Sequence, residues 1–224
     1  MKAEIIGDLH TLNDRTRALL PAADIPLLYF GLAHACLATA LAILTVNPSL
    51  PGPFFLHPRL VAVVHLVTLG WISGSILGAF YIVAPLALRM PLVAGWLDRV
   101  AFAAFAAGVI AMVTLFWSAQ YSAMVWPASL VMVGVLYVAS RTWMGVPGAV
   151  VPWPVKLHVA LAFANMIGAS ALGTFLGLNR AHAWFTWSPL PSAYAHLHMA
   201  VVGWATMMFV GLAIVRASRS GPLC

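Results

Sequence analysis

The chain has 224 residues, of which 63% are hydrophobic and only 7% are Asp, Glu, Lys or Arg. Ordinary soluble domains contain about 25% of these charged residues, so the composition excludes a soluble domain of this length. The apolar residues form long runs without the alternation of β-strands. This pattern excludes a membrane β-barrel and favours an all-α bundle of membrane-spanning helices.

Six apolar runs are long enough for a transmembrane helix, which needs about 20 residues. Loops rich in Pro, Gly and Asn separate them. The sequence therefore predicts six transmembrane helices at 25–46, 59–88, 99–118, 123–141, 155–178 and 193–216. We expect three parts of the chain: a cytoplasmic or interfacial segment at 1–24, the membrane domain at 25–216 and a cytoplasmic tail at 217–224.

The basic residues indicate the orientation of these helices. Six spans place both termini on one side, and that side holds nine of the eleven Lys and Arg residues, leaving only Arg59 and Arg180 opposite. Because basic loops face the cytoplasm, we expect both termini on the cytoplasmic side of a bacterial inner membrane. This topology explains the formal charge of +6, so the sequence does not indicate a nucleic-acid partner.

The second and sixth spans share a motif of His, four apolar or small residues, Gly and Trp. It reads "HLVTLGW" from His65 to Trp71 and "HMAVVGW" from His198 to Trp204. Both helices enter from the outer face, and each histidine lies about 9 Å along its helix. Two imidazoles at one depth can bind the two axial faces of a haem iron. The alternative is a chance repeat in a chain with nine Trp and 17 Gly.

Small and aromatic residues accompany the two histidines. Gly70, Gly74 and Gly78 are four residues apart and form one flat stripe on the second helix. Such stripes commonly serve close helix contacts in membranes, and here they would also give room for the edge of a porphyrin. We expect Trp71 and Trp204, which end the two motifs, to lie beside the same cofactor.

Arg59 and Arg180 are the two cations expected on the outer face. Arginine pairs well with carboxylates, so we expect these side chains to meet haem propionates. Solubility of the loops is the simpler alternative. Trp184, Trp187 and Tyr194 are typical of an interfacial aromatic belt, and a docking surface for a soluble electron donor is the alternative.

Other histidines leave alternatives open. His34 lies inside the first span and His158 at the inner edge of the fifth. A pair of these two would bind a second, inner haem, whereas each alone would be a hydrogen-bonded or interfacial histidine. His57 and His182 are expected in outer loops, where they would be solvated or would join His196 in an exterior metal site.

The H-x-H of His196 and His198, followed by Gly203 and Trp204, resembles the late helix of subunit I of haem–copper oxidases and nitric oxide reductases. The second span, "HLVTLGWISGSILGAFYIVAPLAL", resembles short subunit-I-like membrane proteins and, more distantly, the haem- and copper-containing nitric-oxide-response proteins. The resemblance is confined to these two spans.

This resemblance implies that His65 and His198 ligate a low-spin haem, while His196 faces a second, high-spin haem. Residues two apart in a helix differ by about 200° in direction, so the two histidines of H-x-H cannot face one iron. The family's copper centre does not carry over, because no histidine occurs between His65 and His158. Oxygen reduction at a copper centre is therefore not expected, and copper is the less favoured cofactor.

The sequence predicts a membrane protein that binds one or two b-type haems and transfers electrons. The expected partners are lipid, a redox protein or quinone, and a gas such as O2 or NO at an open iron. The chain would act alone, as a homo-oligomer or as a subunit of a complex, and any enzymatic activity would be that of an oxidoreductase. The alternatives are a haem or copper carrier or assembly factor, and a non-catalytic subunit of a respiratory complex.

Overall fold

The computed structural model describes residues 24–52, 54–90, 92–186 and 188–219. Six of its helices are long and apolar enough to cross a membrane, which confirms the predicted helical bundle. They are Asp24–Val46, Pro58–Leu86, Trp96–Trp117, Tyr121–Gly148, Trp153–His182 and Leu190–Val215. Most boundaries lie within a few residues of prediction, but the fourth helix continues well past 141. The expected N-terminal segment, except residue 24, and the end of the tail lie outside the described residues.

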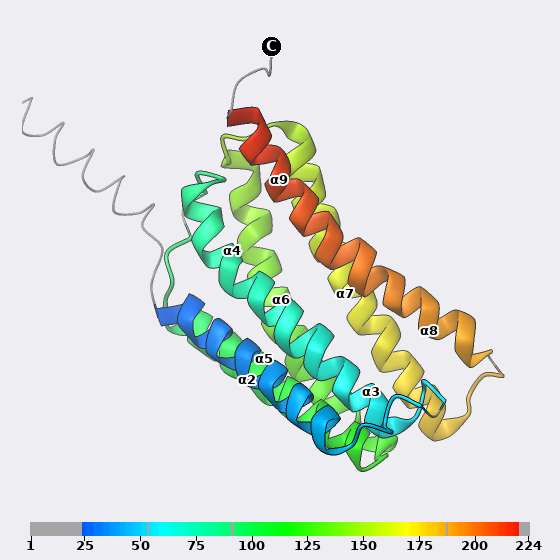
Figure 1. The fold of residues 1–224 in the computed structure, drawn as a ribbon. Helices are drawn as coiled ribbons and strands as arrows, with labels where there is room; N and C mark the ends of the chain where they lie inside the picture. Colours follow the sequence, from blue (N-terminus) through cyan, green and yellow to red (C-terminus); the bar gives the residue numbers. More distant parts are fainter. Residues whose placement is uncertain (1–23, 53, 91, 187, 220–224) are drawn as a thin grey trace, which may run out of the picture.

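Three of the six spans contain more than one type of helix, and no strand occurs in the described ranges. The elements are α2 (Asp24–Val46), α3 (Pro58–His65), η1 (Leu66–Ser73), α4 (Gly74–Leu86), α5 (Trp96–Trp117), η2 (Tyr121–Ala123), α6 (Val125–Gly145), η3 (Val146–Gly148), α7 (Trp153–His182), α8 (Pro189–His198), η4 (Met199–Thr206) and α9 (Met207–Arg219). Helix α2 packs on η1 and α4, α5 packs on α6 and α3, and α7 packs on η4 and α9. Figure 1 shows α2 and the α8–α9 span at opposite sides of this bundle.

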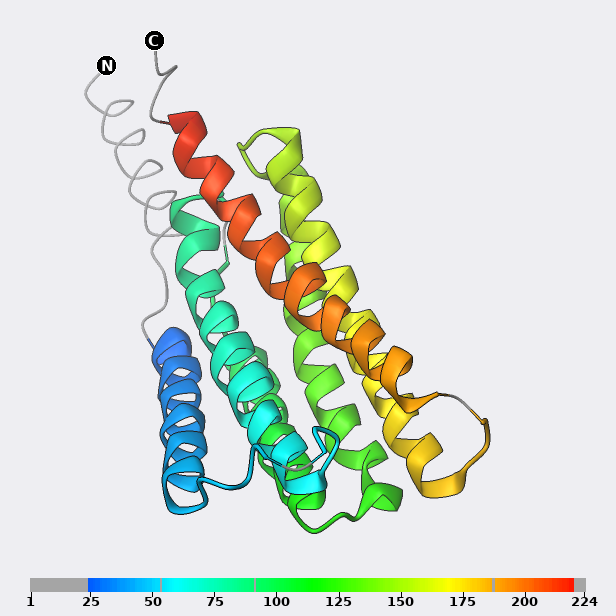
Figure 2. The same cartoon turned by 45° about the vertical axis from the view of Figure 1, so that its right-hand side comes forward.

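Consecutive spans run in opposite directions and give the bundle two distinct ends. Helices α2, α5 and α7 begin at the end where α4, α6 and α9 finish (Figures 1 and 2). We call this the Asp98 end, after a buried carboxylate in the first turn of α5. We call the opposite end, where α3 and α8 begin, the histidine end, because His65 and His196 lie toward it.

The repeated sequence motif is also a repeat of backbone structure. His65 directly precedes the π-helix η1, and His198 directly precedes the π-helix η4; each π-helix has eight residues and leads into a 13-residue α-helix. Both contain a hydroxyl that donates to the carbonyl five residues earlier, at 3.0 Å: Ser73 to Thr68 and Thr206 to Val201. Because π-helices are rare, the repeated motif coincides with a repeat of an uncommon backbone structure.

Trp204 connects the two π-helices in the centre of the bundle. Its side chain is buried, and Nε1 donates to Ser73 Oγ at 3.1 Å. The indole also packs on the ring of Phe163, with 5.2 Å between ring centres. Trp71, at the matching position of η1, is half-buried. The two tryptophans of the repeat therefore have different surroundings, and Trp204 has a structural contact of its own.

The glycine stripe of η1 and α4 faces α2. A Cβ atom on Gly70 would lie 2.7 Å from Cys36 Cβ, and one on Gly74 would lie 3.3 Å from Ala33 Cβ. Gly78 meets α2 in the same way. The stripe thus allows close helix packing, and the expected role of Gly70 and Gly74 beside a cofactor is not supported, because α2 occupies that face.

Candidate functional site

The histidine end brings two imidazoles together from different spans. His65 ends α3 and His196 lies in α8, and both side chains are half-buried. Their ring centres are 6.3 Å apart, and the ring planes differ by only 19°. The structure therefore places His196 beside His65, where the sequence analysis expected His198.

Each of these imidazoles is oriented by a backbone carbonyl. His65 Nδ1 donates to Val61 O at 2.8 Å, and His196 Nδ1 donates to Ala169 O at 3.0 Å. A carbonyl only accepts hydrogen bonds, so in each neutral ring the hydrogen is on Nδ1 and the lone pair is on Nε2. Histidines that bind metals commonly donate their second nitrogen in this way.

The separation of the two ring centres equals the one that a shared metal ion would require if both Nε2 atoms pointed at it. With metal–nitrogen bonds of about 2.0 Å and roughly 1.1 Å from each nitrogen to its ring centre, two imidazoles on opposite sides of one metal have centres about 6.2 Å apart. The observed separation is 6.3 Å. The donor set is the one that a haem iron with two axial imidazoles requires.

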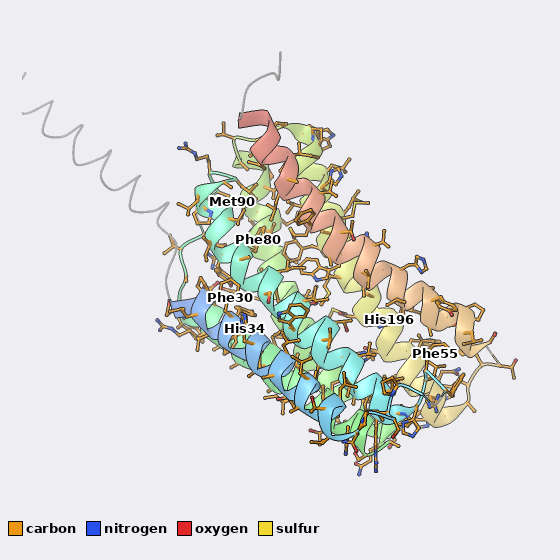
Figure 3. All side chains as sticks on the ribbon, in the orientation of Figure 1. Phe30, His34, Phe55, Phe80, Met90 and His196 are labelled. Carbon is orange, nitrogen blue, oxygen red and sulfur yellow. The ribbon has the colours of Figure 1, made fainter. Side chains whose placement is uncertain are left out.

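Helix α7 receives His196 at a position without a side chain. A Cβ atom on Gly173 would lie 2.7 Å from Cε1 of His196. Since Ala169 O holds Nδ1 of the same ring, α7 fixes both the position and the orientation of this imidazole. Figure 3 labels His196 where α8 faces α7.

An aromatic ring covers His65 from α5. The ring centre of Phe116 lies 4.7 Å from that of His65, with 33° between the planes. Phe116 also contacts Tyr121 of η2, with 6.1 Å between ring centres. The candidate site is thereby connected to the loop that joins α5 and α6.

Arg59 and Arg180 flank this same loop. The guanidinium carbon of Arg59 lies 5.3 Å from the ring centre of Trp117, and that of Arg180 lies 5.0 Å from the ring centre of Tyr121. Cation–π contacts of this kind hold the planar groups in place. Neither arginine has a carboxylate partner in the part of the chain that the structure describes. Both can therefore bind an anionic group.

His198 lies on a different face of the sixth span. Its side chain is exposed, and Nδ1 donates to Tyr194 O at 2.8 Å. Residues two apart differ by about 200° in direction, so turning His196 toward α3 turns His198 away. The expected pair of His65 and His198 rested on equal depth and on the resemblance to oxidase subunit I, and depth does not determine which face of a helix points inward.

The structure does not bring His34 and His158 together. His34 is exposed on α2, where Nδ1 donates to Phe30 O at 2.7 Å (Figure 3). His158 lies in α7 next to α9, since a Cβ atom on Gly211 would be 2.8 Å from His158 Cβ. Because α4 lies between α2 and α9 (Figures 1 and 2), the expected inner haem between these histidines has no support.

The exterior metal site expected from His57, His182 and His196 is also not assembled. Within residues 24–219, apart from the three masked positions, no group of three or more His, Cys, Asp or Glu side chains is placed to hold a metal. His182 is instead stacked on Trp184, with 5.0 Å between ring centres. The close pair of His65 and His196 thus remains as the candidate metal-binding position.

The Asp98 end contains a polar cluster that the sequence analysis missed. Asp98 is fully buried, and its Oδ1 accepts from Tyr81 OH at 2.7 Å. Its Oδ2 accepts from Gly95 N at 2.7 Å, from Tyr137 OH at 3.2 Å and from Arg141 Nη1 at 3.4 Å. Sequence reasoning assigned Asp98 to a loop. A signal was present, because Gly95 and Asp98 have the spacing of a helix capping box.

Comparison with known proteins identifies no relative of the chain. No family model, curated protein or solved structure matches it. The resemblance to subunit I of haem–copper oxidases therefore stays a prediction.

Proposed function

We propose that the chain is a membrane protein that binds haem b and transfers electrons, with His65 and His196 as the two axial ligands of one iron. One observation carries this proposal: the two imidazoles are nearly parallel, 6.3 Å apart, and each uses Nδ1 for a backbone carbonyl. A haem held by His65 and His196 would supply one-electron transfer chemistry at the histidine end.

The surrounding residues support the ligands in separate ways. Val61 O and Ala169 O keep both Nε2 atoms unprotonated, which a metal ligand requires. Phe116 limits rotation of the His65 ring by packing on it. In the proposal, Arg59 and Arg180 bind the propionates, because their guanidinium groups are held on aromatic rings without carboxylate partners.

We further propose that the Asp98 end faces the cytoplasm of a bacterial inner membrane. Six basic residues at that end lie in described loops or near helix ends, and two lie at the histidine end, which supports this orientation. Reporter fusions at Pro51 and Pro147 test it. We expect the exterior at Pro51 and the cytoplasm at Pro147, and the reverse pattern would reject the orientation.

A visible spectrum of the purified chain tests the haem proposal. We expect one haem per chain with the sharp reduced bands of a low-spin b-type cytochrome, and we expect His65→Ala to abolish them. His34→Ala is the matched control, because His34 has the same bond from Nδ1 to the carbonyl four residues earlier but lies on α2. Weak and variable occupancy would favour a haem carrier instead, and absence of haem would favour a structural subunit.

A further inference from the structure

Tyr29 has a buried hydroxyl group without a hydrogen-bond partner. Its side chain is fully buried in α2, and its OH finds no donor or acceptor among the described residues. Buried hydroxyl groups are nearly always satisfied, by the protein or by an ordered water, because an unsatisfied one destabilises the fold. This hydroxyl therefore points to a ligand that the protein itself does not provide.

Tyr29 lies against the Asp98 cluster. Its ring centre is 6.1 Å from that of Tyr81, which donates to Asp98, and 5.0 Å from that of Phe102, one turn after Asp98 in α5. Side chains of a helix lean toward its N-terminus, and α2 begins at the Asp98 end. The side chain of Tyr29 therefore extends toward the Asp98 end of the bundle.

The same cluster reaches the surface of the bundle. Arg141 donates through Nη1 to Tyr137 OH at 3.0 Å and through Nη2 to Val93 O at 2.9 Å, and 26% of its side chain is exposed. Tyr137 OH donates in turn to Asp98. Hydrogen-bonding groups therefore follow one another from the surface at Arg141 to the interior at Asp98, one step short of Tyr29.

We propose that the Asp98 end is a water-binding site that completes this chain of hydrogen bonds. The bound water accepts from Tyr29 OH and donates to the Asp98 carboxylate, which gives it the two or more polar partners that buried waters need. With this water, the hydrogen bonds that start at Tyr29 and at Arg141 both run toward the Asp98 carboxylate, and the hydroxyl of Tyr29 gains an acceptor. The site does not depend on haem, so it stands or falls separately from the function proposed above.

Water-edited solid-state NMR on the full chain in lipid tests this site. The chain has only five tyrosines, so selective tyrosine labelling gives few signals, and single Tyr→Phe variants assign them. We expect water magnetisation to reach buried Tyr29 as early as it reaches exposed Tyr194. Transfer to Tyr29 that is as slow as transfer to the dry core would overturn the proposal.

Thermal unfolding supplies a second, independent measurement. Tyr29→Phe should lower the midpoint of unfolding, because the variant loses the bridge between α2 and Asp98. Tyr194→Phe, the same change at an exposed ring, should leave the midpoint unchanged. If the unfolding midpoint of Tyr29→Phe is equal to or above that of the unmodified chain, the hydroxyl of Tyr29 has no bound partner. This result would also overturn the proposed water site.

Discussion

The two ends of the bundle differ in how their polar side chains are hydrogen-bonded. At the Asp98 end, four donors from α4, α6 and the turn before α5 converge on one carboxylate of α5. At the histidine end, each of two neighbouring imidazoles has one nitrogen on a backbone carbonyl, and the other nitrogen has no hydrogen-bond partner among the described residues. The hydrogen-bonded carboxylate of Asp98 holds helices together. The Nε2 lone pairs of His65 and His196 are instead available to bind a ligand.

The sharpest way to break this comparison is to remove one histidine at a time. We expect His196→Ala to lose the low-spin haem completely, as a lost axial ligand should. His198→Ala should keep it, because His198 is exposed on another face. Haem content and spin state of the two variants measure this. If His198→Ala loses the haem and His196→Ala retains it, the pairing implied by the oxidase resemblance holds and the pairing proposed here is wrong.

At the Asp98 end, we expect Asp98→Ala to cause the largest loss of stability. The variant removes the acceptor of two tyrosine hydroxyls and the carboxylate partner of Arg141, and removing one partner of a buried ion pair costs about 3–5 kcal/mol of unfolding free energy. Denaturant unfolding in detergent measures it. The control is Asp24→Ala, which removes a solvent-exposed ion pair with Arg99 and should change stability little. Equal effects of the two variants would contradict a structural role for Asp98.

Gly173→Ala should disturb the histidine end without removing a ligand. The new Cβ would lie 2.7 Å from Cε1 of His196, so the ring has to move away from Ala169 O. We expect a partial loss of low-spin haem. Gly31→Ala is the matched control, because a Cβ atom there meets nothing within 4 Å. An unchanged spectrum in Gly173→Ala would show that α7 does not orient His196.

The smallest of these effects is expected between the two ends, from Ser73→Ala. The change leaves Trp204 Nε1 without its acceptor, and a buried donor without a partner costs about 1–3 kcal/mol. Unfolding in detergent measures the loss, and the haem spectrum should persist. An effect on haem as large as that of His196→Ala would mean that the contact between η1 and η4 belongs to the site.

The six spans were predictable because their signal is length and apolar composition, both of which the sequence states directly. The choice between His196 and His198 was not predictable in the same way. His196 and His198 lie in one helix among similarly apolar neighbours, so hydropathy does not distinguish them. Only the rotation of α8 relative to α7 decides which of the two faces α3. Gly173 makes that rotation favourable, and no local pattern connects Gly173 with a histidine 23 residues later.

The Asp98 cluster shows a second limit of sequence reasoning. Its members, Tyr81, Asp98, Tyr137 and Arg141, are spread over three helices, and each alone resembles an interfacial residue. Their convergence depends on the packing of α4, α5 and α6. The glycines of the second span illustrate the reverse case, because the commoner use of such a stripe, contact with another helix, is the one that the structure shows.

The two π-helices also constrain how this chain can change in evolution. A π-helix bonds each N–H to the carbonyl five residues earlier, so adding or deleting one residue there alters the winding and rotates every side chain beyond it. Such a change in η1 would turn Tyr81 away from Asp98, and one in η4 would alter the packing of α9 on α7. In relatives of this chain, gaps should therefore fall in the loops, and frequent gaps within 66–73 or 199–206 would argue against a conserved π-helix.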